Sequence, residues 1–208
     1  YVYQYSNATN KWYSLLQKTG RTGNAKFGEF VSIGAGTNFE PDNHLSYQNH
    51  ALVIAFSEVY SLHHRIHVRR FTGDKTHGVI WNAYTEVLTL NSISGLQSLV
   101  LSNDGTTFAY KTSTRINVYE GSSYIGYITV GSGDVLKISS NGDRIASVDT
   151  SGKIAVYERD GSSWTKLGDT GVAKGTGLAL SKDGSEFAVQ SGGSWTVYRW
   201  SGTWTSIG

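Results

Sequence analysis

The stretch VYERDGSSW, residues 156–164, is one copy of a pattern that recurs along this chain and decides its fold. Each copy has an apolar run ending near Tyr or Phe, a turn rich in Gly, Ser, Asn or Asp, and an aromatic residue that starts the next run. The other copies are VYQYSNATNKW (2–12), VRRFTGDKTHGVIW (68–81), VYEGSSY (118–124) and VYRWSGTW (197–204). This recurrence predicts a repeat protein.

A second pattern precedes the first one in the C-terminal half of the chain. An apolar run is followed by a Ser-containing turn with Asn-Gly or Asp-Gly, and then by another apolar run. Such a pair favours a tight hairpin, because both residues can take a positive φ. The copies are LVLSNDGTTFAY (99–110), LKISSNGDRIAS (136–147) and LALSKDGSEFAV (178–189). The complete unit is therefore four strands in about 40 residues.

The repeats divide the chain into one half unit and four full units. The half unit is 1–16, and the full units are 27–84, 96–130, 134–168 and 176–208. In the first full unit, strands are expected from Phe27 and over 51–58, 65–71 and 79–84, with an insertion over 36–50. Because the 1–16 unit has only its two outer strands, a closed ring would need further sequence on one side.

The predicted fold is an all-β propeller of four-stranded antiparallel blades, with four full blades and the outer half of another. A four-stranded unit repeated at this period is typical of propeller blades. The second strand of each unit is apolar on both faces, as blades packed face to face require. A two-sheet sandwich is the alternative, but it does not need one repeated unit. No long window has the 3.6-residue period of a helix.

The stretch ISSNGDRIASVDTSGKIAVYE (138–158) resembles the core of a WD40 repeat. Tyr157 stands where that family has Trp, no Asp follows it, and no Gly-His pair precedes the unit, so the His/Asp network of the family is not expected. The ending VYERDGSSWTKLG is closer to FG-GAP-like and related propeller repeats of marine microbes and large viruses. The resemblance covers most of 96–208 and implies the fold more than a function.

Composition excludes several classes of function. The chain has no Cys, which rules out disulfides and thiolate metal sites, and its net charge of +2 gives no reason to expect nucleic acid. No apolar stretch is long enough for a membrane helix. The Ser-x-Asp-Gly turns carry too few carboxylates for a calcium loop, and we expect neither a metal nor a cofactor. A glycosylation sequon at Asn7 slightly favours an extracellular or particle-surface location.

The innermost strand of each blade should line the central channel. Four polar residues fall at the same phase of these strands and are expected to lie near the channel mouth: Glu29, Gln97, Asp134 and Thr176. Two of them are carboxylates, so a glycoside hydrolase using an acid and a base is one alternative function. Polar residues at the start of a strand also need no function, because they face water. We therefore expect no catalytic residue.

All six histidines lie between positions 44 and 77, in the first full unit. A metal site using His63 and His67 with a histidine of the insertion is an alternative, but the sequence shows no obvious carboxylate or thiolate partner. A solvated basic edge or a patch that binds a partner fits better. Insertions in propellers lie on a rim, where partners dock. The candidate partner-binding residues are Phe39, Leu45 and Tyr47 of the insertion, with Arg65, His67, Arg69 and Arg70.

One aromatic residue begins the outer strand of each unit. The structural interpretation is that these rings pack between blades. The functional alternative is a set of stacking platforms for sugars, as in propeller lectins, which would give weak multivalent binding. The residues are Trp12, Trp81, Tyr124, Trp164 and Trp204.

The sequence therefore favours a non-enzymatic interaction scaffold that binds a protein partner or a neighbouring subunit. A carbohydrate-binding propeller is the first alternative and a hydrolase is the second. No contact with nucleic acid and no insertion into a membrane is expected.

Overall fold

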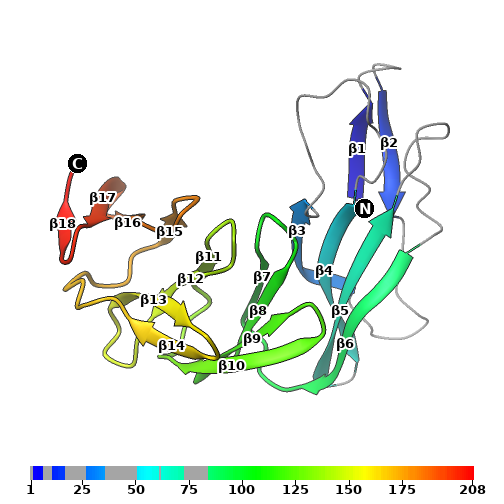
Figure 1. Ribbon diagram of the computed structural model, residues 1–208, viewed down its shortest axis with the longest axis horizontal. Helices are drawn as coiled ribbons and strands as arrows, with labels where there is room; N and C mark the ends of the chain where they lie inside the picture. The colour runs from blue at the N-terminus through cyan, green and yellow to red at the C-terminus, as the bar shows by residue number, and fades with distance from the viewer. Residues whose placement is uncertain (1, 7–10, 17–26, 36–50, 61, 73–83) are drawn as a thin grey trace.

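The computed structural model describes residues 2–6, 11–16, 27–35, 51–60, 62–72 and 84–208 of the chain (Figure 1). Every regular element among them is a β-strand, and the strands form four sheets of four strands and one of two. The all-β class and the four-stranded antiparallel blades predicted from the sequence are confirmed.

The four larger sheets, here called blades 1 to 4, follow one another along the chain. Within each blade, every strand pairs with the next one in the sequence. Blade 1 contains β3 (Phe27–Ala35), β4 (Ala51–Tyr60), β5 (His63–Thr72) and β6 (Tyr84–Ile93). Blade 2 contains β7 (Ser98–Leu101), β8 (Thr107–Lys111), β9 (Arg115–Glu120) and β10 (Ser123–Thr129). Blade 3 contains β11 (Leu136–Ile138), β12 (Arg144–Val148), β13 (Ile154–Asp160) and β14 (Ser163–Lys166). Blade 4 contains β15 (Gly177–Leu180), β16 (Glu186–Ser191), β17 (Ser194–Trp200) and β18 (Trp204–Ser206).

The outer strand of blade 1 lies later in the chain than the sequence indicated. It begins at Tyr84, where the expected strand over 79–84 ends, and continues to Ile93. Residues 79–83 lie outside the described residues. The two-stranded sheet is formed by β1 (Val2–Ser6) and β2 (Lys11–Leu16), which pair antiparallel as the half unit predicts.

The inner strands β3, β7, β11 and β15 lie beside one another in that order, and each blade packs face to face on the next. The blades form an open arc, with blade 1 and blade 4 at its two ends (Figure 1). We call the face of a blade that points toward the next blade its trailing face, and the opposite face its leading face.

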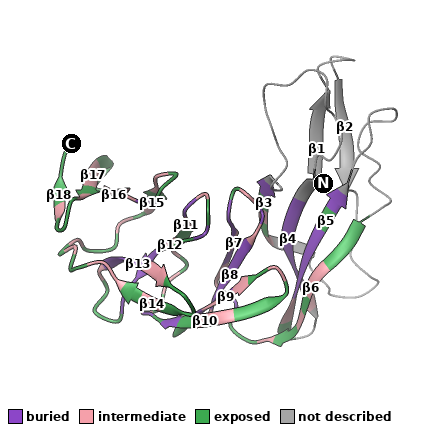
Figure 2. Ribbon diagram, viewed as in Figure 1, coloured by how far each residue is buried: buried purple, intermediate pink, exposed green. Residues whose placement is uncertain are grey.

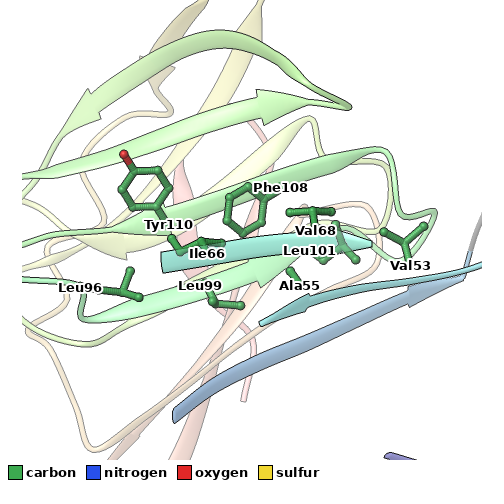
Figure 3. Packing of buried hydrophobic residues seen from close by; sticks show 9 residues of the cluster. All are labelled: Val53, Ala55, Ile66, Val68, Leu96, Leu99, Leu101, Phe108 and Tyr110. Carbon is green, nitrogen blue, oxygen red and sulfur yellow. The ribbon is translucent and has the colours of Figure 1, made fainter. Parts of the chain in front are cut away.

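Three apolar cores lie between successive blades. In the first, Val53, Ala55, Ile66 and Val68 of blade 1 meet side chains of blade 2 such as Phe108 (Figure 3). The second core joins blades 2 and 3, and the third joins blades 3 and 4. Buried residues therefore concentrate in blades 1 to 3, whereas the strands of blade 4 are mostly half-buried or exposed (Figure 2).

The Ser-x-Asp-Gly turns close the inner hairpin of blades 2 and 4. In blade 2, Ser102 Oγ donates to Asp104 Oδ1 at 2.5 Å, and Gly105 takes a φ of 70° that favours glycine. The turns also connect blades, because the Asp104 N–H donates to the Ser140 carbonyl at 3.1 Å. These carboxylates therefore satisfy backbone and hydroxyl donors of the turn itself.

Candidate functional site

The trailing faces of the four blades carry the same apolar residues at matching positions of the strand register. Strand two of every blade has an alanine, and strand three has a valine directly opposite it. A second position on strand three is Ile in three blades and Trp in the last. The three sets are Ala55, Ala109, Ala146 and Ala188; Val68, Val118, Val156 and Val197; and Ile66, Ile116, Ile154 and Trp195.

These positions are buried in blades 1 to 3 and uncovered in blade 4. The members in the first three blades are at most 2% exposed, because the next blade covers them. In blade 4, Trp195 is 50% exposed, and both Ala188 and Val197 are only half-buried. Ile207, whose N–H donates to the Val197 carbonyl, is 46% exposed. The trailing face of blade 4 is therefore an interblade surface without a described neighbour.

The leading face of blade 1 has a matching exposed strip on its inner strand. Val31 and Ile33 of β3 are each 49% exposed. They hold the register positions that Leu99 and Leu101 hold in blade 2, where both leucines are buried against blade 1. Both ends of the arc thus expose residues of the type that buries the joints between blades.

A polar network lies across β4, β5 and β6 on the leading face of blade 1, beside Ile54 and Phe56, which are at most 1% exposed. His67 Nδ1 lies 3.0 Å from Glu86 Oε1, and Arg69 Nε donates to Glu86 Oε2 at 2.7 Å. Thr89 Oγ1 donates to Glu86 Oε1 at 2.7 Å. On the other side of the imidazole, His67 Nε2 is 3.7 Å from Glu58 Oε2. The histidine therefore lies between two carboxylates on neighbouring strands.

Burial and packing fix this network. His67 and Arg69 are both buried, and the His67 ring stacks on Phe56 with centroids 5.1 Å apart. Burial alone would raise the pKa of Glu86, but hydrogen bonds from Thr89, Arg69 and His67 hold it below its usual value. Glu86 is therefore an anion, and its negative charge balances the guanidinium group of Arg69.

The structure distributes the predicted partner-binding residues over different environments. His67 and Arg69 are inside the network, Arg65 is half-buried with its Nε donating to Asn91 Oδ1 at 2.7 Å, and Arg70 is exposed. Phe39, Leu45 and Tyr47 lie outside the described residues. The sequence interpretation missed Glu58 and Glu86, whose positions beside His67 follow only from the pairing of β4, β5 and β6. Within the described ranges, no group of three or more His, Asp or Glu residues is arranged to hold a metal ion.

Three of the expected channel residues, Gln97, Asp134 and Thr176, precede the inner strands of their blades, and Glu29 lies within β3. The Gln97 N–H donates to the Lys111 carbonyl, and the Thr176 N–H donates to the Gln190 carbonyl, both at 2.9 Å. The Asp134 side chain is exposed. The Glu29 side chain lies outside the described part of β3. Gln97 and Thr176 therefore occupy related backbone positions, each beside the second strand of its blade.

Lys111 is a further residue of this region that the sequence did not single out. It is fully buried, and its Nζ donates to the Gly131 carbonyl at 2.6 Å. Burial lowers the pKa of the Lys111 amine to about 8, although Asp134 acts in the opposite direction. The ammonium group thus supports the connection between blades 2 and 3.

The aromatic residues that start the outer strands differ in exposure. Trp164 packs against the core between blades 2 and 3, and Trp204 packs against the core between blades 3 and 4. The Trp204 Nε1–H donates to the Leu167 carbonyl at 2.6 Å. Tyr124 is 52% exposed. Trp81, Asn7 and the side chain of Trp12 lie outside the described residues.

The described residues contain no helix long and apolar enough to cross a membrane.

Comparisons with known proteins identify the architecture. The sequence matches no protein-family model and no curated protein. The structure is similar to Sqt1 of Saccharomyces cerevisiae, a WD40 β-propeller protein, with a TM-score of 0.54 and 14% identity over 87% of this chain and 48% of Sqt1. It is also similar to a Bacteroides fragilis protein described in its structure as a candidate 6-phosphogluconolactonase, with a TM-score of 0.50 and 13% identity over 84% of this chain and 57% of that one.

A third similar structure is the β-propeller domain of Cps50 from Myceliophteria thermophila, with a TM-score of 0.46 and 12% identity over 74% of this chain and 54% of that domain. This chain spans about half the length of these structures. Together with the four antiparallel sheets, the likeness to Sqt1 and to the Bacteroides fragilis protein shows that the fold is a β-propeller.

Proposed function

We propose that this chain is a non-enzymatic propeller scaffold that binds protein through the trailing face of blade 4. One observation carries the proposal: positions that the next sheet buries in blades 1, 2 and 3 are half-buried in blade 4 at Ala188 and Val197 and exposed at Trp195. Similarity to the WD40 propeller Sqt1 supports a protein-binding role.

The chemistry of this face favours a protein over an ion or a sugar. Its central positions are Ala188, Val197 and Trp195, which offer apolar area and almost no polar groups. Its charged pair neutralises itself, because Arg199 Nε donates to Glu186 Oε1 at 2.7 Å. Burying such a surface is favourable by about 25 cal/mol per Å² of apolar area. A partner with an apolar, sheet-like surface would gain this free energy of apolar burial without having to desolvate an unpaired charge.

A photo-crosslinking experiment tests the proposal. A photoreactive phenylalanine analogue replaces Val197 in one version of the protein and Leu62 in a control version. Leu62 is 88% exposed in the β4–β5 turn, away from the trailing face. After irradiation in the producing cells, we expect a defined protein adduct from position 197 and none from position 62. Identical adduct patterns at both positions, or no protein adduct at 197, would contradict the proposed binding face.

A further inference from the structure

We propose that the outer part of the leading face of blade 2 is a second binding surface, which takes an acidic segment of a partner protein. The surface, here called the tyrosine–arginine patch, consists of Arg115 and Asn117 on β9 and of Tyr124 and Tyr127 on β10. It lies on a different blade from the trailing face of blade 4 and is independent of the function proposed for that face.

Two exposed tyrosines share this face because β10 contains a bulge. Tyr124 and Tyr127 are three positions apart, and in a regular strand they would point to opposite faces. The register shifts between Tyr124 and Gly126. Before the shift, Tyr124 pairs with Tyr119, and after it Tyr127 pairs with Asn117. Because Asn117 and Tyr119 are two positions apart on β9, both tyrosines of β10 point to the same side.

Gly126 fixes this bulge. Its φ is 127°, a value that other residues rarely adopt, and a Cβ at this position would lie 2.5 Å from the Ser162 carbonyl oxygen of blade 3. The placement of the two tyrosines is therefore set by the backbone of β10 and by its packing on the next blade.

Both tyrosines remain half exposed although they belong to a face between blades. Tyr124 is 52% exposed and Tyr127 is 50% exposed. On the inner part of the same face, Phe108 and Tyr110 are buried against blade 1. Tyr119 is partly buried, and its ring meets the Tyr124 ring edge-on with centroids 5.3 Å apart. The buried aromatic residues thus support an exposed aromatic surface.

The patch has a positive charge that no described residue neutralises. The Arg115 side chain is exposed, and its guanidinium carbon lies 4.6 Å from the centroid of the Tyr127 ring. Within the described part of the chain, no carboxylate forms an ion pair with Arg115. The single acidic residue of β9 and β10 is Glu120, which points to the opposite face and binds Arg159 of blade 3. An anionic partner would therefore meet no repulsion from these two strands.

An acidic peptide segment supplies the groups that this patch can bind. A guanidinium held over an aromatic ring still presents its N–H donors, and their rigid fork fits a carboxylate in a bidentate way. Tyr and Arg are also among the residue types that contribute most to binding at protein interfaces. Because the bulge interrupts β10, the partner is recognised by side chains and not as an added strand. A stacked sugar fits less well, since Arg115 already covers a face of the Tyr127 ring.

An NMR titration with synthetic peptides tests the patch. The probe is a short acetylated peptide in which Glu alternates with Leu, and the matched peptide has Gln in place of Glu. The Glu peptide should shift the amide resonances of β9 and β10. The Gln peptide should bind about tenfold more weakly, because it offers no carboxylate to the guanidinium group. Equal affinity for the two peptides, or shifts confined to other strands, would overturn the proposal.

Charge-removing variants separate the patch from the general charge of the chain. Arg115→Gln should weaken binding of the Glu peptide about tenfold. Lys182→Gln is the matched control, because it removes the same charge from an exposed residue in the inner turn of blade 4, and it should leave the affinity unchanged. If both variants lose affinity equally, the peptide responds to overall charge and the proposal is wrong.

The chain also contains a matched control for the tyrosines. Tyr84 is 46% exposed, and the guanidinium carbon of Arg69 lies 4.2 Å from the centroid of its ring, but Glu86 neutralises Arg69. Tyr127→Leu should weaken binding of the Glu peptide, and Tyr84→Leu should not. The titration of the wild-type chain locates the site without any variant, so it decides the question if a variant fails to fold.

An acidic oligosaccharide is the final probe. Oligogalacturonate has carboxylates on sugar rings and should bind more weakly than the Glu peptide. If it shifts the β9 and β10 resonances at lower concentration than the peptide does, the ligand is an acidic glycan and the assignment to a protein partner is wrong.

Discussion

Trp195 holds in blade 4 the register position that Ile116 holds in blade 2, yet Trp195 is 50% exposed and Ile116 is fully buried. Both residues lie on the third strand of their blade and point toward the trailing side. The difference arises from the neighbour, because blade 3 covers Ile116 and no described sheet covers Trp195. Alanine substitutions at Val156 in blade 3 and at Val197 in blade 4 compare a covered and an uncovered trailing face by their effect on stability.

Val156→Ala should destabilise the chain by roughly 2 kcal/mol, since it leaves a cavity in the core between blades 3 and 4. Val197→Ala makes the same chemical change on the half-buried face and should cost less than about 0.5 kcal/mol in a monomer. Urea denaturation at low protein concentration measures both. Equal losses would show that the face of blade 4 is as well packed as the interior.

The two interblade tryptophans should respond differently to replacement by Phe. Trp204 donates a hydrogen bond to the Leu167 carbonyl, whereas Trp164 Nε1 is buried with no hydrogen-bond partner among the described residues. Trp204→Phe should therefore be more destabilising than Trp164→Phe by about 1 kcal/mol. Thermal unfolding of the two variants provides the comparison, and the reverse order would contradict the bonding seen here.

Asp149→Asn should destabilise the chain by about 1–3 kcal/mol at neutral pH. This buried carboxylate accepts hydrogen bonds from Ser151, Lys153 and Lys166, which hold its pKa well below its usual value although burial acts to raise it. Because the folded-state pKa is depressed, the stabilisation is present above the ordinary carboxyl pKa and is lost as the pH falls through the folded-state pKa.

The difference in the free energy of unfolding between the wild type and Asp149→Asn should accordingly become smaller at acidic pH. Asp169→Asn is the matched control, since the Asp169 side chain is 64% exposed and it should change stability little. If this difference stays constant from neutral to strongly acidic pH, the ionised carboxylate of Asp149 is not the source of the stabilisation.

Lys111 should make stability rise with pH in the alkaline range. Its folded-state pKa of about 8 lies below that of an unfolded lysine, so the unfolded chain binds more protons between the two values. The gain from pH 8 to pH 10 should be on the order of 2 kcal/mol. Lys111→Met should remove most of this rise. Measurements should stop near pH 10, because burial raises the pKa of Tyr110 to about 12 and its titration would lower stability above that range.

Glu86→Gln should destabilise blade 1 by about 1 kcal/mol, an estimate reduced for the partial exposure of the carboxylate. The change leaves buried Arg69 without its anion and removes the charge beside His67. Glu158→Gln is a comparison with the same chemistry, but its partner Arg144 is more exposed than Arg69 and the loss should be smaller. Hydrogen exchange of β5 amides would locate the effect, and protection unchanged in β5 would show that the network does not stabilise this strand.

The sequence alone determined the four-stranded unit, its number of copies and the alternation of faces. These features are local: Asn-Gly and Asp-Gly pairs define hairpins, and a two-residue period assigns Arg65, His67 and Arg69 to one face of a strand. The outer strand of blade 1 was placed too early, because neither its start nor its two register shifts against β5 leaves a local pattern.

Only the tertiary structure decided which side chains meet. Glu86 lies beside His67 although the two residues are 19 positions apart in the sequence. Lys111 donates to Gly131 in the connection between blades 2 and 3, and Trp204 donates to Leu167 in the preceding blade. The exposure of Trp195 likewise depends on a neighbouring sheet and not on its own strand. Such contacts depend on the register between strands and on the packing of one sheet against another, and residue spacing within a single strand contains no information about either.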